Sequence, residues 1–252
     1  MIKAAIEAAK AAGDIQLKHY RKVKTITKKG AKDFFTNVDI ACEKAIITII
    51  RKSHPNHSFL SEEAGSIDAG SGYLWIIDPL DGTHNYIHGL PEFGVSIGLE
   101  KDGELQIGVI YLPINGKLYC AEKGKGAFLN GKRIHVSEVK SLGDALMLQE
   151  GVLHRKVPHK LTFLGKALKT VFKVRMLGSA AVAFGSVAEG TSDVLVTFET
   201  NPWDVAAGFL LVREAGGSVT DFKGNPIDHY ASRFIATNSS IHGETVALCR
   251  KF

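Results

Sequence analysis

The feature that most constrains the fold is a short apolar run that ends in an acidic residue. Residues 74–77, Leu-Trp-Ile-Ile, predict a core strand, because an uninterrupted apolar run of this length suits a strand with both faces buried. Asp78 then lies at the carboxyl end of that strand, where open α/β sheets place their ligands. Pro79 is expected to stop the strand. The run therefore predicts an α/β protein with an acidic site at a strand end.

Just downstream, Asp81-Gly82-Thr83 predicts a turn into a helix, with Asp81 or Thr83 as the N-cap. The backbone N–H groups at such a helix end face outward and can hold an anion. Two carboxylates beside the same anion would repel a phosphate unless divalent cations lay between them. The local pattern therefore predicts a site for metal and phosphate together.

Acidic residues recur at the ends of other predicted elements. Any one of them alone is best interpreted as a capping or surface carboxylate. Several converging on one cleft need cations, because like charges about 4 Å apart cost on the order of 4 kcal/mol per pair at an effective dielectric near 20. Oxygen ligands without cysteine favour magnesium or manganese over zinc. The set consists of Asp39, Glu62, Asp78, Asp81 and Asp204.

Periodicity predicts an alternation of helices and strands along the chain. A basic loop is expected between the first two helices, and turns at Asp102-Gly103 and Asn115-Gly116 predict hairpins. Helices are expected at residues 2–19, 37–52, 159–169, 179–189 and 202–215, and from residue 241. Strands are expected at residues 58–60, 74–77, 95–99, 106–111, 117–121, 145–149, 171–176, 194–198 and 234–236.

Length and composition are those of a globular protein. Residues 1–252 are interpreted as one domain, with a hairpin-rich lobe at 1–140 and an α/β lobe at 141–252. No segment approaches the ~18 apolar residues of a membrane span. The three cysteines are widely spaced and form no CxxC pair, which indicates reduced thiols of a cytoplasmic protein.

The net charge of +5 arises partly from a basic run at residues 18–32. No aromatic interleaving or nucleic-acid motif accompanies this run. It is interpreted as a solvated face that also attracts phosphate, with nucleic-acid binding as the alternative.

Two familiar motifs occur in the wrong structural context. Residues 94–98 spell G-x-S-x-G, but they belong to an alternating strand, so Ser96 is interpreted as structural. Residues 126–132 spell G-x-x-x-x-G-K, but Arg133 follows where a phosphate loop needs Ser or Thr, which favours a hairpin.

Two long motifs and four short ones resemble the inositol monophosphatase family. The segment WIIDPLDGTHNYIHGLPEFGVSIGL at 75–99 is similar to its first signature, and PWDVAAGFLLVREAGG at 202–217 is similar to its C-terminal signature. The short matches are DFFTNVD at 33–39, FLSEEAG at 59–65, GAFLNGKRI at 126–134 and RMLGSAA at 175–181.

The resemblance covers nearly the whole chain and keeps the order of the motifs. It implies a layered α-β-α-β-α sandwich and a lithium-sensitive phosphomonoesterase that uses two or three Mg²⁺ ions, with Mn²⁺ as a substitute. It also implies a homodimer. Hydrolysis would proceed in line through a metal-activated water, without a phosphoenzyme.

The resemblance also assigns metal ligands at the matching positions. It implies that Glu62, Asp78 and the Leu80 carbonyl bind one metal, and that Asp78, Asp81 and Asp204 bind another.

The same matches imply the groups that act on substrate and water. Gly82 and Thr83 would hold phosphate oxygens through backbone N–H groups, and Asp81, Ala180 and Asp204 would contact the substrate. Thr83 paired with Asp39, together with Glu62, would orient and deprotonate the attacking water.

One position departs from the family pattern. Inositol-preferring members usually carry Glu seven residues before the C-terminal Asp, where this chain has Thr197. Glu199 is close, but it is out of phase on a strand and should point to the other face. Inositol 1-phosphate is the leading substrate. The alternatives are fructose 1,6-bisphosphate, histidinol phosphate and 3′-phosphoadenosine 5′-phosphate, and an RNA- or transcription-associated factor is the alternative from another class.

Overall fold

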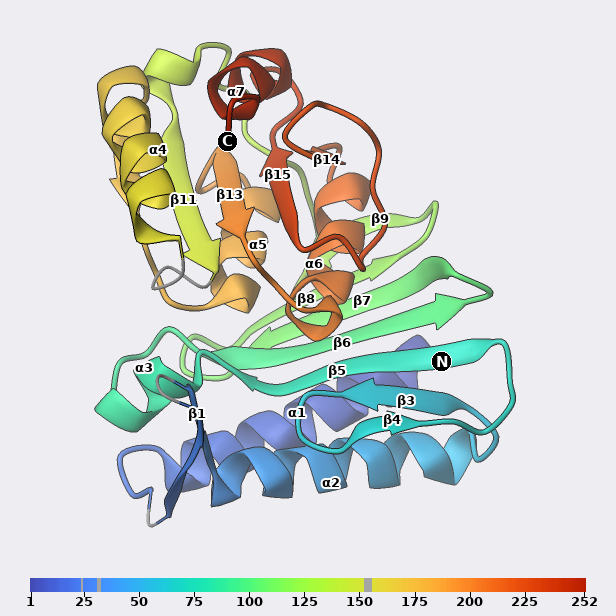
Figure 1. Cartoon of the computed structure of the whole chain (residues 1–252). Helices are drawn as coiled ribbons and strands as arrows, with labels where there is room; N and C mark the ends of the chain where they lie inside the picture. The colour runs from blue at the N-terminus through green and yellow to red at the C-terminus, as the bar shows by residue number, and fades with distance from the viewer. Residues whose placement is uncertain (24, 31–32, 152–155) are drawn as a thin grey trace.

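The computed structural model describes residues 1–252 except 24, 31–32 and 152–155. Five layers follow one another in Figure 1: helices α1 and α2, a large sheet, helices α5 and α6, a second sheet, and helices α4 and α7. This arrangement confirms the predicted α-β-α-β-α sandwich. None of the helices in the described part of the chain is long and apolar enough to cross a membrane.

The N-terminal helices cover the outer face of the large sheet. Helix α1 (Ile2–His19) buries a stripe of small side chains against helix α2 (Asn37–Ser53), because alanines at helical spacing allow the two axes to approach closely. The sequence predicts a basic loop between these two helices. This prediction is wrong, because strands β1 (Ile26–Gly30) and β2 (Asp33–Thr36) pair there as an antiparallel hairpin. Lys24 and Lys32 of the basic run lie outside the described residues.

The large sheet has the strand order β10-β9-β8-β7-β6-β5-β3-β4. All neighbours are antiparallel except β3 and β5, and the hairpins predicted from the turn residues are confirmed. Ser96 lies buried in β6, as expected of a structural residue. The strands are β3 (Ser58–Ser61), β4 (Gly65–Ile67), β5 (Tyr73–Asp81), β6 (Gly94–Lys101), β7 (Glu104–Leu112), β8 (Lys117–Glu122), β9 (Gly126–Leu129) and β10 (Lys132–Ile134).

Strand β5 does not stop at Pro79 but continues to Asp81, which corrects the expectation from the sequence. Its pairing with β6 is irregular between Asp78 and Asp81. Proline is tolerated in a sheet at such irregularities, because no ladder hydrogen bond is required of it there. The short helix α3 (Thr83–His88) begins after Gly82, which has a left-handed backbone and is the N-cap; the expected N-cap at Asp81 or Thr83 is wrong.

The second sheet has the strand order β12-β11-β13-β15-β14. Strand β11 is parallel to both of its neighbours, and β15 is antiparallel to β13 and β14. The strands are β11 (Leu146–Gly151), β12 (Lys173–Arg175), β13 (Val194–Phe198), β14 (Ser218–Thr220) and β15 (Arg233–Thr237). The helices are α4 (Val157–Thr170), α5 (Ala180–Ala188), α6 (Pro202–Glu214) and α7 (His242–Cys249).

Helix α6 is buried between the two sheets, where it contacts β6 and β7 closely (Figure 1). A Cβ atom at Gly98 would lie 2.8 Å from Ala206 Cβ, and one at Gly108 would lie 2.6 Å from the Ala207 carbonyl oxygen. The two glycines therefore set how near the helix comes to the large sheet. This distance in turn places the first turn of α6, which carries Asp204, beside the end of β5.

Candidate active site

A pocket of about 270 Å³ opens where the end of β5 faces the first turns of α5 and α6. Five of the residues predicted from the sequence line it: Asp81, Gly82, Thr83, Ala180 and Asp204. The remaining predicted residues do not line it: Asp39, Glu62, Asp78 and Leu80. The structure thus brings the two long sequence motifs to one pocket from opposite halves of the chain.

Asp78 is the electrostatic centre of the acidic set. Burial raises its pKa well above the ordinary value, and the negative charges of Glu62, Asp81 and Asp204 raise it further. The Leu80 N–H donates to Asp78 Oδ1 at 3.0 Å, which offsets part of this cost. Each of these three charges therefore disfavours the ionised form of Asp78, which is the condition that a cation relieves.

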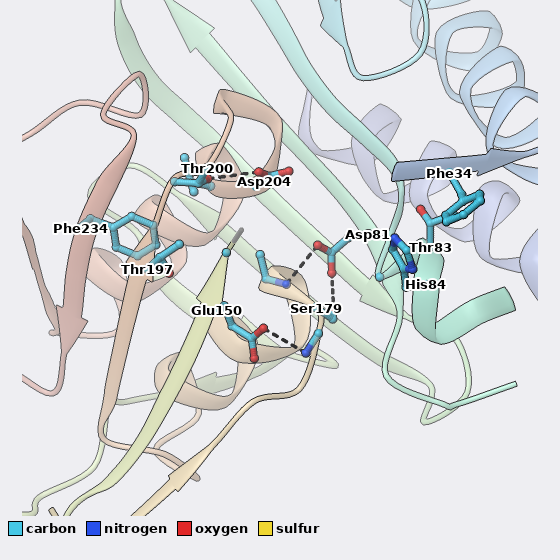
Figure 2. Close-up of a pocket in the computed structure, with 15 residues that line it drawn as sticks. Phe34, Asp81, Thr83, His84, Glu150, Ser179, Thr197, Thr200, Asp204 and Phe234 are labelled. Carbon is cyan, nitrogen blue, oxygen red and sulfur yellow. Dashed lines mark hydrogen bonds between the residues drawn. The ribbon is translucent and has the colours of Figure 1, made fainter. Parts of the chain in front are cut away.

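Asp81 connects the large sheet to helix α5. Its carboxylate accepts hydrogen bonds from the Ala180 N–H at 3.1 Å, the Ala181 N–H at 3.0 Å and the Ser179 hydroxyl (Figure 2). Burial raises the Asp81 pKa, although these three donors favour the charged form. The Asp81 side chain thus caps a helix that begins about a hundred residues later in the chain.

Asp204 is held in the first turn of α6. Its Oδ2 accepts from the Asn201 N–H at 2.8 Å and from the Thr200 hydroxyl at 3.2 Å. Burial raises the Asp204 pKa to about 6, and the nearby charge of Asp81 contributes to the rise. Pro202 fits the first turn of the helix because it needs no hydrogen-bond acceptor there.

Thr83 and Asp39 are paired, as the sequence predicts. The Thr83 hydroxyl is 3.2 Å from Asp39 Oδ1 and 2.9 Å from the Leu80 carbonyl oxygen, so it can donate to either. Asp39 Oδ2 accepts from the N–H and hydroxyl of Thr36, which caps α2. Burial raises the Asp39 pKa despite these donors.

Glu62 and Glu63 belong to the turn between β3 and β4, not to an extended segment. Alternation along a strand therefore does not decide which of the two faces the site. Glu62 is the one whose charge acts on Asp78. The buried carboxylate of Glu43 holds the turn, because its Oε1 accepts from the Ser61 hydroxyl, the Glu63 N–H at 3.2 Å and the Ala64 N–H at 3.0 Å.

Several pocket residues were not predicted from the sequence. Ser179 is the first residue of the helix predicted at 179–189 and is of a common N-cap type, and in the structure it caps α5. Glu150 follows a predicted strand directly, as Asp78 does. Its two oxygens accept from the Leu177 N–H at 2.6 Å and the Gly178 N–H at 3.0 Å, and burial raises its pKa to about 7. The other unpredicted lining residues are Phe34, His84, Gly151, Gly178, Thr200, Val205 and Phe234.

Thr197 lines the pocket and Glu199 does not. The phase argument from the sequence is not the reason, because residues two apart on a strand face the same side and Glu199 lies beyond the end of β13, with a left-handed φ of 60°. The Glu199 carboxylate lies 3.9 Å from Lys156 Nζ and 3.7 Å from Lys160 Nζ, in a separate cavity.

The donor set at the end of β5 fits a hard divalent cation, since carboxylate and carbonyl oxygens are the ligands that Mg²⁺ prefers. As the side chains lie, no three His, Cys, Asp or Glu residues of the described segments are near enough together to enclose an ion. Asp81 and Asp204 are instead engaged with N–H and hydroxyl donors of the chain. A carboxylate has about four acceptor positions, so these bonds leave capacity for a cation.

Residues 1–251 match the inositol monophosphatase family. A fructose-1,6-bisphosphatase/inositol-1-monophosphatase of Thermotoga maritima is 39% identical, covering 96% of this chain and 92% of that protein. The Nus factor SuhB of Escherichia coli K12 is 38% identical with the same coverage.

Solved structures agree with these sequence relatives. A Thermotoga maritima IMPase has a TM-score of 0.92 at 37% identity, covering 99% of this chain and 96% of that one. An IMPase/NADP phosphatase complexed with Mg²⁺ and phosphate has a TM-score of 0.83 at 25% identity, covering 95% and 90% of the two chains.

Proposed function

The chain belongs to the inositol monophosphatase family and is a phosphoric monoester hydrolase, and we propose that its substrate is a small polyol or sugar phosphate. Inositol 1-phosphate is the leading candidate. The observation that carries the proposal is the meeting of Asp81 and Asp204, from the two signatures, in one pocket with Gly82 and Thr83. Carboxylates beside backbone N–H donors suit a phosphate that is bound together with cations.

Two or three Mg²⁺ ions, replaceable by Mn²⁺, are proposed as cofactors. Glu62, Asp78 and the Leu80 carbonyl would hold one, and Asp78, Asp81 and Asp204 another. Burial, together with the negative charges of Glu62, Asp81 and Asp204, raises the Asp78 pKa, and this supports the assignment. Bound there, Mg²⁺ supplies the positive charge that balances the carboxylates and the substrate phosphate.

The chain's own groups would position the substrate and the water. The N–H groups of Gly82 and Thr83 would hold phosphate oxygens, and the small side chain of Ala180 leaves room for the ring of the substrate. The Thr83 hydroxyl, supported by Asp39, would orient the attacking water in line with the leaving group. Glu62 would take the proton from that water.

A phosphate-release screen over a panel of monoesters tests this function. Release should need Mg²⁺ or Mn²⁺, stop with a chelator, and be inhibited by lithium. Full activity in metal-free buffer would refute the proposed mechanism. The panel also separates inositol 1-phosphate from fructose 1,6-bisphosphate, histidinol phosphate and 3′-phosphoadenosine 5′-phosphate.

Glu62 and Glu63 offer a matched pair of variants, because they are adjacent in one turn. Glu62→Gln should lower kcat by orders of magnitude, since it removes both a metal ligand and the proton acceptor. Glu63→Gln should retain most of the activity. Equal losses in the two variants would show that the ligand assignment is wrong.

A homodimer is also proposed, supported by an exposed apolar face on and after α4. Isolated exposed apolar residues are ordinary, but these recur at helical spacing and continue beyond the helix. They are Val157, Leu161, Leu168, Phe172 and Met176. Light scattering should give twice the monomer mass for the wild type and the monomer mass for Leu161→Asp with Leu168→Asp. Monomeric wild type would refute this proposal.

An RNA- or transcription-associated role is a second candidate, supported by the 38% identity to the Nus factor SuhB. Asp204→Asn protein, expected to lack phosphatase activity, should then still shift RNA in a gel, with an affinity that falls as salt rises. No shift at low salt would remove this candidate.

A further inference from the structure

A second cavity, of about 410 Å³, lies beside β13 but apart from the candidate active site. Thr197 lines the active-site pocket, whereas Phe198, the next residue of the strand, lines the second cavity. Because successive residues of a strand face opposite sides of the sheet, the two cavities open on opposite sides of β13. A ligand in the second cavity would therefore not occupy the substrate pocket.

Positive side chains outnumber negative ones around the second cavity. Lys156 and Lys160 line it from the start of α4, and Arg233 lines it from the start of β15. Glu199 contributes the one carboxylate side chain among the lining residues that the structure describes. Three positive charges and one negative leave an excess of two. A phosphate monoester carries about two negative charges at pH 7 and would balance this excess.

Lys160 is a buried member of this positive set, since it is only 4% exposed. Its Nζ lies 3.7 Å from Glu199 Oε2 and 6.0 Å from the centre of the Phe198 ring. The contact with Glu199 is longer than a hydrogen bond, and Oε2 accepts no hydrogen bond from the described residues. An anion in the cavity would thus lie beside an ammonium group that the fold holds away from water, where the attraction between charges is stronger than at the surface.

Arg233 and two aromatic rings complete the cavity. Arg233 Nη1 donates to the main-chain oxygen of Phe252 at 2.9 Å, and His159 Nε2 lies at the same distance from that oxygen. This bond holds the guanidinium at the cavity wall, and a guanidinium has five N–H donors. The rings of Phe198 and Phe252 add apolar surface beside the charges. Charged groups next to apolar rings suit an organic anion, and the volume is in the range of small-molecule sites.

We propose that the second cavity binds a small organic phosphate as a ligand separate from the substrate. Its phosphate group contacts Lys156, Lys160 and Arg233, which are the side chains that form charge-assisted hydrogen bonds with phosphate oxygens. Its carbon part packs against the two rings. The site is independent of the proposed function, because none of its residues belongs to the proposed metal or substrate site.

Titration calorimetry with phenylphosphonate tests this site. The probe carries a ring and a phosphorus–carbon bond, which a phosphate monoesterase does not hydrolyse. A chelator in the buffer removes cations from the active-site carboxylates, which then repel the probe. The wild type should bind one equivalent. Arg233→Gln and Lys160→Gln should each weaken binding by about tenfold, as expected for loss of a hydrogen bond between charged groups.

Glu199→Gln should have the opposite effect. It removes the negative charge that lies beside the bound anion, so binding should strengthen by about a few-fold, a result that general damage to the cavity would not produce. Lys169→Gln is the matched control, because Lys169 is exposed in the last turn of the same helix and should leave the affinity unchanged. If Lys160→Gln fails to fold, Arg233→Gln still decides the question, since Arg233 is exposed.

Three results would overturn the proposal. The first is no binding by the wild type at millimolar probe, or the same affinity in Arg233→Gln, Glu199→Gln and the wild type. The second is an affinity that changes in Asp204→Asn alone, because the probe would then lie in the active-site pocket. The third is benzoate binding as tightly as phenylphosphonate, which would exclude a site selective for phosphate. Wild-type protein inactive on every monoester would refute the proposed function and leave this binding result unaffected.

Discussion

Replacing Glu43 tests how the Glu62 turn is held. In Glu43→Ala the Ser61 hydroxyl, which is fully buried, loses its acceptor, and an unpaired buried polar group costs ~1–3 kcal/mol. Glu63 is half-buried and Ala64 is exposed, so their N–H groups can bond water instead and add less to the cost. The variant should lose ~2–4 kcal/mol of unfolding free energy, or roughly 5–12 °C in Tm for a chain of this size.

The same change should affect function through Glu62. A turn without its anchor samples more conformations, and a misplacement of about 1 Å can cost on the order of a hundredfold in rate. Phosphate release by Glu43→Ala should therefore be slower and should need more Mg²⁺ for half-maximal rate. Calorimetry and a magnesium titration of activity measure the two effects separately.

Lys44→Ala is the control, because Lys44 is exposed on the same helix turn and its removal should change stability by no more than ~0.5 kcal/mol. If Glu43→Ala melted at the same temperature as Lys44→Ala and showed the same magnesium requirement, the anchoring role of Glu43 would be refuted.

Three other predictions concern the site, the packing and the pH response. Asp81→Asn and Asp204→Asn should each lower kcat by orders of magnitude with an unchanged circular dichroism spectrum, and near-normal rates would exclude them as ligands. Gly108→Ala should lower Tm, because its Cβ would lie 2.6 Å from a backbone oxygen of α6, whereas Gly165→Ala meets open space and should keep or raise Tm. The raised Glu150 pKa of about 7, against 4.5 unfolded, means that the folded state binds more protons between these values. In metal-free buffer, the unfolding free energy of the wild type should therefore fall by up to ~3 kcal/mol between pH 4.5 and 7, relative to that of Glu150→Gln. Urea unfolding measures both free energies, and parallel pH profiles of the two proteins would contradict this prediction.

Local patterns predicted most of the elements. The hairpin strands β6, β7 and β8 followed from alternation and turn residues, and β13 has the predicted bounds of residues 194–198. The β1–β2 hairpin does not follow from the local pattern, because a lysine-rich segment with a few β-forming residues suits a loop as well as a hairpin. The continuation of β5 through Pro79 was missed because a pairing irregularity that accommodates proline depends on the neighbouring strand.

The candidate site, like the fold, can be predicted only in part from local sequence. Asp78 and Glu150 both stand at the ends of predicted strands. The local sequence therefore makes both of them candidate site residues and does not show which of the two is the better candidate. Which strand ends meet is decided by the docking of the two sheets on α6, and that is a property of the whole fold. The hydrogen bond from Ser179 to Asp81 cannot be predicted from local sequence for the same reason, since it joins residues 98 positions apart.

The cap that Asp81 provides to helix α5 has a consequence for how the protein reaches its active form. Contacts of such sequence separation form only after long loops have closed, which makes them late events in folding. A chain that has folded only its first half would hold Asp39, Glu62, Asp78 and Asp81, yet the pocket would lack the walls that α5 and α6 supply. During refolding, hydrolytic activity should therefore return after the secondary structure does, together with the last step of assembly.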